Sequence, residues 1–120
     1  MITQDQLKDV LDRTDKLRHY LKIDEKKIEF EEEDLRTQAP DFWEDQKRAE
    51  AQMKKVKAIK KWIDGYNDVR AAADELQLAF DFYKEEMVTE EEVDADYQRA
   101  ISLIEDLELK NMLRQKDDPM

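Results

Sequence analysis

Residues 45–86 read DQKRAEAQMKKVKAIKKWIDGYNDVRAAADELQLAFDFYKEE and contain no proline and a single glycine, Gly65. The apolar residues of this stretch recur mostly three or four positions apart, which is the spacing of one face of an α-helix. They are Ala49, Met53, Val56, Ile59, Ile63, Tyr66, Ala73, Leu76, Phe80 and Tyr83. A glycine inside a helix costs only about 1 kcal/mol. The sequence therefore predicts one unbroken helix of roughly 60 Å, at 1.5 Å per residue.

A seven-residue repeat precedes this helix. Its positions are Leu7, Thr14, Leu21, Ile28 and Leu35, with Val10 and Leu17 at the intervening positions. Such a repeat is typical of a helix that packs in the manner of a coiled coil. The next two intervening positions are Asp24 and Glu31, so the second half of the seam is poorer. Asp24 is also a candidate cap for a helix that restarts there.

Local signals mark the joints between the helices. Pro40 disfavours helical backbone at the residue before it and ends the first segment, and Asp45 can cap the long helix. Thr89 and Glu92 form a capping-box pattern that predicts the start of a last helix. The apolar face of that helix comprises Val93, Tyr97, Ala100, Ile101, Ile104, Leu107 and Leu113, and Asp117-Asp118-Pro119 is expected to end it.

Short joints make consecutive helices antiparallel neighbours. The long helix outreaches both of its neighbours, so residues 24–58 are expected to protrude as a two-helix arm. The predicted fold is all-α: an elongated antiparallel helical bundle with a protruding coiled-coil arm. Residues 1–120 are expected to form a single domain, and the protein is expected to be a monomer.

Composition excludes most catalytic sites. Phosphate-cradling and nucleophile-elbow loops need two or more glycines, whereas Gly65 is alone. Cysteine is absent and His19 is the one histidine, so thiolate and histidine metal sites are excluded. We expect no enzyme, no cofactor, no metal and no small-molecule substrate. No apolar run approaches a membrane span and no secretory signal is visible, so a cytoplasmic protein is expected.

One part of this acidic chain is basic. The chain has a net charge of −11, yet residues 37–64 carry seven basic and five acidic side chains. Lys47, Lys54 and Lys61 repeat every seven residues, with Lys57 beside them, and they point away from the apolar face of the helix. One interpretation is a solvated face paired with the acidic run at residues 31–34. The other is a contact to RNA or to an acidic partner.

Phe42 and Trp43 follow Pro40 at the expected tip of the arm. Two interpretations are open for this aromatic pair. The rings fold back to cover the end of the helical hairpin, or they form an exposed knob that docks on a partner.

The linear order of several motifs resembles a known family. The motifs are Leu17-Arg18-His19-Tyr20-Leu21, Asp24-Glu25-Lys26-Lys27, Pro40-Asp41-Phe42-Trp43, Lys47-Arg48-Ala49-Glu50-Ala51 and the segment from Glu105 to Leu113. Their order and spacing resemble the N-terminal helical domain of the release factor 2 branch of the bacterial class I peptide chain release factors. The resemblance covers essentially the whole chain.

This resemblance implies a function in translation termination at UGA and UAA codons. In the family, a Gly-Gly-Gln loop is credited with hydrolysis and a Ser-Pro-Phe tripeptide with codon reading, and this sequence has neither. The resemblance thus implies a domain without chemistry, cut before the decoding and catalytic regions. It also implies docking at the base of the ribosomal stalk, near protein L11 and its rRNA. A generic coiled-coil interaction scaffold and a tRNA-binding helical arm are the alternatives.

Overall fold

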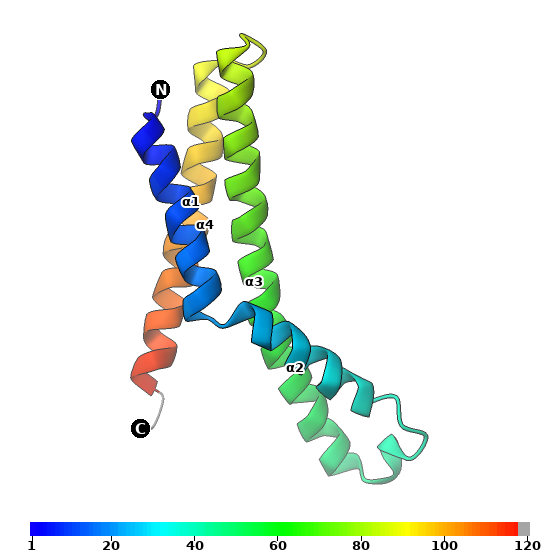
Figure 1. The fold of residues 1–120 in the computed structure, drawn as a ribbon. Helices are drawn as coiled ribbons and strands as arrows, with labels where there is room; N and C mark the ends of the chain where they lie inside the picture. The colour runs from blue at the N-terminus through cyan, green and yellow to red at the C-terminus, as the bar shows by residue number, and fades with distance from the viewer. Residues whose placement is uncertain (118–120) are drawn as a thin grey trace.

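The computed structural model of the protein describes residues 1–117, and these residues form helices and no strand (Figure 1). In chain order the elements are α1 (Gln4–Tyr20), α2 (Ile23–Arg36), the short 3-10 helix η1 (Phe42–Glu44), α3 (Gln46–Lys84) and α4 (Glu90–Asp117). The predicted all-α fold is confirmed. The predicted stop of the last helix at Asp118 and Pro119 lies outside the described residues.

Helix α3 is continuous over 39 residues, as predicted. Asp45 caps it, because its Oδ1 accepts a hydrogen bond from the Arg48 backbone N–H at 3.2 Å. The helix passes through Gly65 without a break, and Gly65 has no positive φ angle. Nearly every residue of the predicted apolar face is buried, with Met53 and Tyr83 half-buried.

The first helical segment breaks at Lys22, which adopts left-handed backbone at φ 51° and ψ 50°. Asp24 does not cap the restarted helix, so this prediction is wrong. Asp24 lies in the first turn of α2 and pairs with Arg18 at 2.8 Å across the break. The ammonium of Lys26 donates to the carbonyl oxygen of Leu21 and thereby satisfies one backbone group that α1 leaves free.

The break explains why the seven-residue repeat predicts burial correctly only in its first half. Leu7, Thr14 and Leu21 are buried, but Ile28 and Leu35 are 60% and 66% exposed. The left-handed residue resets the helical phase, and Ile23 becomes the buried residue that follows Leu21. The second half of the predicted seam therefore faces solvent.

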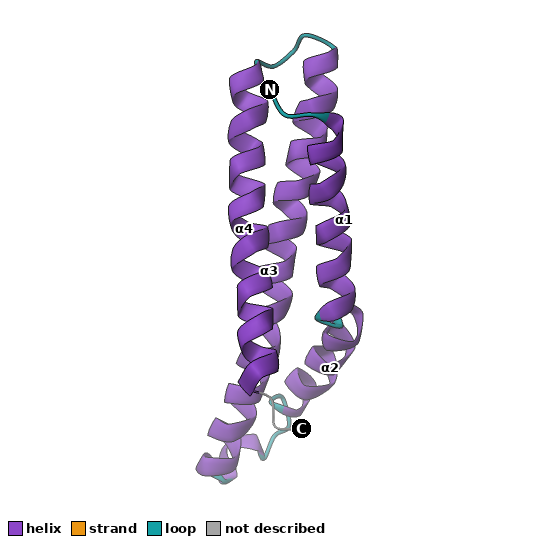
Figure 2. Cartoon of the chain, turned by 90° about the vertical axis from the view of Figure 1, so that its left-hand side faces the viewer, coloured by secondary structure: helices purple, strands orange, loops and turns teal. Residues whose placement is uncertain are grey.

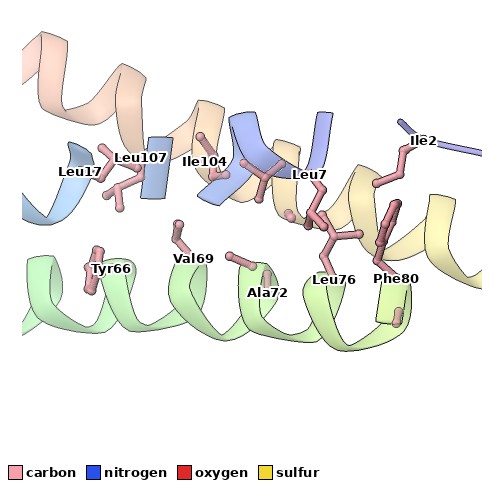
Figure 3. Close-up of a cluster of buried hydrophobic side chains, with 14 of the residues drawn as sticks. Ile2, Leu7, Leu17, Tyr66, Val69, Ala72, Leu76, Phe80, Ile104 and Leu107 are labelled. Carbon is pink, nitrogen blue, oxygen red and sulfur yellow. The ribbon is translucent and has the colours of Figure 1, made fainter. Parts of the chain in front are cut away.

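The main core lies where α1, α4 and the C-terminal half of α3 run side by side (Figures 2 and 3). It includes Ile2, Leu7, Leu17, Tyr66, Val69, Ala72, Leu76, Phe80, Ile104 and Leu107. The predicted face of α4 is correct up to Leu107, but Leu113 is exposed and Asn111 is buried in its place. At 100° per residue, position 111 continues the stripe and position 113 leaves it.

The arm, residues 24–58, diverges from this bundle (Figure 1). The molecule measures 60 × 33 × 19 Å and has a Cα radius of gyration of 18.6 Å. A compact domain of this length would have a radius of roughly 13–14 Å, so the elongated shape is confirmed. None of the helices in residues 1–117 is long and apolar enough to cross a membrane.

The capping box at the start of α4 is formed as predicted. The Glu92 N–H donates to Thr89 Oγ1 at 3.2 Å, and the Thr89 N–H donates to Glu92 Oε2 at 3.1 Å. We expect Thr89→Ala to lower the free energy of unfolding by about 0.5–2 kcal/mol, measured by chemical denaturation. Ser102→Ala, which removes an exposed hydroxyl from the interior of α4, is the control and should cost nothing. Equal midpoints for wild type and Thr89→Ala would contradict the cap.

Candidate docking surface on the helical arm

The arm is a two-helix structure with a small apolar core of its own. On α3 the buried residues of the arm and its base are Ala49, Val56, Ile59 and Ile63, and none of them belongs to the main cluster. Two helices bury less apolar surface than three. Polar interactions between α2 and α3 therefore contribute a larger share of the stability of the arm than polar interactions do in the three-helix bundle.

A buried carboxylate provides the clearest of these interactions. Glu33 of α2 is only 7% exposed. The side-chain amide of Gln52 on α3 donates to both the Glu33 carbonyl oxygen and its Oε2, each at 2.8 Å, and Lys55 lies 3.3 Å from Oε1. The Gln52 hydrogen bond, with help from Lys55 and against the effect of burial, lowers the pKa of Glu33. This contact fixes the register of the two helices in the arm.

The four predicted lysines lie together on the opposite side of α3 from this core, and we call them the basic face. They are Lys47, Lys54, Lys57 and Lys61, and all four are exposed. Within residues 1–117 none of them forms an ion pair. The predicted pairing with the acidic run is therefore not found, because Glu33 pairs with Lys55 and Arg36 instead.

The two aromatic residues at the tip of the arm differ in exposure, so each fits a different one of the two interpretations, hairpin cover and exposed knob. Phe42 is half-buried and lines a hollow of about 550 Å³ between the end of α2 and the start of α3. Trp43 is 62% exposed and meets Phe42 edge-on, with ring centroids 5.1 Å apart. Phe42 thus covers the hairpin end, whereas Trp43 stands on the surface.

The exposed side chains of this surface, all within the described residues, do not form a metal site. Among the described residues no group of histidine and carboxylate side chains is arranged to hold a metal ion. His19 is exposed at the end of α1, apart from the basic face. Exposed ammonium groups that form no ion pair within the described residues favour contact with an anionic surface.

Sequence reasoning missed the cations that α4 adds near Lys61. Lys110 and Arg114 line the same groove as Lys61 and Trp62. They are distant in sequence, and only the antiparallel register of α3 and α4 brings them together. That register could have been read from the short joint at residues 85–89.

Comparisons with known proteins extend over the arm, α3 and α4. A family model described as a PCRF domain matches residues 24–119, which include the basic face and both tip aromatics. Peptide chain release factor 2 of Aeromonas hydrophila subsp. hydrophila is 30% identical over 117 residues, which cover 94% of this chain and 32% of that protein. The chain thus spans about a third of the length of this relative.

The buried Glu33 gives a test with a defined pH dependence. Glu33→Ala removes the carboxylate that accepts from Gln52 and pairs with Lys55, and it leaves only the hydrogen bond from the Gln52 amide to the carbonyl oxygen of residue 33. We therefore expect a lower free energy of unfolding at pH 7. Because the folded-state pKa lies below its ordinary value of 4.5, this contribution is complete above pH 4.5. It is lost as the pH falls below that value.

Chemical denaturation of wild type and Glu33→Ala between pH 3 and pH 7 measures this difference. The exposed neighbour Glu32 supplies the matched control, and Glu32→Ala should change stability little at any pH. A Glu33→Ala penalty that is as large at pH 3 as at pH 7 would show that the ionised carboxylate does not hold the arm.

Proposed function

The chain belongs to the PCRF domain family, and from this membership we propose that it serves as the helical domain of a peptide chain release factor in translation termination. The observation that carries the proposal is the match to residues 24–119, together with 30% identity to a release factor 2 over nearly the whole chain. The proposed codons are UGA and UAA, in keeping with that relative's branch of the family. The proposed location is the cytoplasm.

In this proposal the domain contributes affinity and orientation to the factor, without any chemistry of its own. The chain has a single glycine, so a Gly-Gly-Gln loop cannot be built from it. No metal-holding cluster is present among the described residues. Peptide release and codon reading would then belong to other parts of a release factor.

The proposed partner is the ribosome at the base of its stalk, with protein L11 and the adjacent rRNA. The basic face suits this role, because rRNA is anionic and the four lysines are exposed in a chain of net charge −11. Phe42 and Trp43 at the tip of the arm are the reserve candidates for the contact. The domain would act as a monomer, without a cofactor or a small-molecule substrate.

The elongated shape explains how such a contact would help. A second attachment point on a stiff arm raises the effective concentration of the rest of the factor at its own site. The arm projects from the bundle, so its surface can reach a partner that the bundle does not touch (Figure 1). Docking of this kind changes association and leaves the chemical step unaltered.

The test changes Lys47, Lys54, Lys57 and Lys61 to glutamine in a release factor that carries this domain. Fewer counterions are then released on binding, so ribosome association should slow and its dependence on salt should flatten. The maximal rate of peptide release at saturation should not change. Stopped-flow association at several salt concentrations, with a single-turnover release assay, measures all three quantities.

A matched control removes the same charge elsewhere. Lys8, Lys16, Lys84 and Lys116 are exposed and lie off the arm, and their change to glutamine should have a smaller effect on association. If both quadruple variants behave alike, or if the basic-face variant behaves as wild type, the basic face is only a solvated surface. The generic coiled-coil scaffold would then be the better interpretation.

A further inference from the structure

The groove in the fork between the arm and the C-terminal part of α4 shares only Lys61 with the basic face of the proposed function. In Figure 1, α4 and the arm diverge from the level at which α3 leaves the bundle. A groove of about 340 Å³ lies there, and we call it the fork groove. Its lining residues are Ala58, Lys61, Trp62, Gly65, Leu107, Lys110 and Arg114.

The only glycine of the chain forms part of the floor of the fork groove. Gly65 has no positive φ angle, so the backbone does not require glycine there. A Cβ atom at this position would meet Leu107 Cδ1 at 3.4 Å, which is an ordinary contact, so packing does not require glycine either. Alanine is the better helix former. Because glycine has no side chain, it leaves the apolar floor of the groove open beside Leu107 and Trp62.

The rim of the fork groove is cationic, and no acidic residue lines it. Lys61 forms no ion pair within the described part of the chain, whereas Lys110 pairs with Asp106 at 2.9 Å. The Arg114 guanidinium lies 5.7 Å from the centroid of the Trp62 ring, and its Nη2 donates to Asn111. Its Nε is buried without a hydrogen-bond partner within residues 1–117.

We infer that the fork groove binds an acidic peptide segment that inserts one apolar side chain. The apolar floor takes the anchor side chain, and Lys61, Lys110 and Arg114 pair with flanking carboxylates. Three cations, one of them already paired with Asp106, surround one apolar groove in a chain of net charge −11, and this arrangement matches an acidic ligand in charge.

The observations favour a peptide over a nucleotide. Arg114 already covers a face of Trp62, so that face of the indole is not free to stack on a base. The polar side chains of the lining are all donors, and a base that buries its own N–H groups there would leave them without acceptors. Carboxylates have no such requirement, because they only accept hydrogen bonds.

The test measures peptide binding through Trp62 fluorescence in the whole chain. Trp43→Phe makes Trp62 the only tryptophan, and the probe is the capped pentapeptide DEFED at 0.15 M salt, which screens long-range repulsion. We expect saturable binding. The peptides DESED and NQFQN, which lack the anchor or the carboxylates, should each bind about tenfold more weakly or worse.

Three variants on this background locate the site. Lys61→Glu reverses a rim charge and should weaken DEFED binding by about fivefold or more. Lys54→Glu makes the same change one heptad away on the basic face, outside the fork groove, and should leave binding within about twofold. Gly65→Leu should fill the floor and abolish binding, with circular dichroism to verify that the variant folds.

Each of three results contradicts the inference: DEFED does not bind at millimolar concentration, Lys61→Glu and Lys54→Glu weaken binding equally, or DEFED and DESED bind equally well. Tighter binding of a five-residue uridine oligonucleotide, weakened by Gly65→Leu, would assign the groove to nucleic acid instead. Because the assay uses no ribosome, its failure is distinguishable from failure of the proposed docking at the stalk base.

Discussion

The continuity of α3 is the constraint on which the other features depend. This helix has 39 residues, whereas α1 has 17 and α4 has 28. Neither neighbour can cover its whole length, so the N-terminal part of α3 is left to the shorter α2. A bundle of three helices at one end and an arm of two at the other follow directly. The elongated shape is thus a consequence of unequal helix lengths joined by short turns.

The hinge between α1 and α2 sets the direction of the arm. Leu21 and Ile23 are fully buried on either side of the left-handed Lys22, so the turn is anchored in the core. Arg18 bridges the turn to Asp24, and the Lys26 ammonium satisfies the Leu21 carbonyl oxygen. Further out, the buried Glu33 fixes α2 on α3. These contacts explain how a thin arm keeps a defined position while its outer lysines stay exposed.

Local signals in the sequence were enough to predict the helices and most of their boundaries. The Thr89 and Glu92 box, the Asp45 cap and the passage through Gly65 depend on neighbouring residues only, and all three are confirmed. The exposure of Ile28 and Leu35 could not be predicted, because one left-handed residue changes the phase of the repeat. The positions of the four basic-face lysines were predicted from spacing alone. The fork groove was not predicted, because the short joint at residues 85–89 indicates which residues of α3 and α4 face each other but not that a groove opens between them.

A docking role requires that a contact on the arm be transmitted to the bundle, and α3 is the element that connects the two. The most direct measurement is the distance between spin labels at Glu50→Cys and Asp81→Cys, two exposed positions of α3. The chain contains no cysteine, so both labels are placed uniquely. Electron–electron resonance should give one narrow distribution centred near 46 Å, from about 1.5 Å per residue. A broad distribution, or a second, shorter distance, would show that α3 bends at Gly65 and that the arm is not a rigid extension of the bundle.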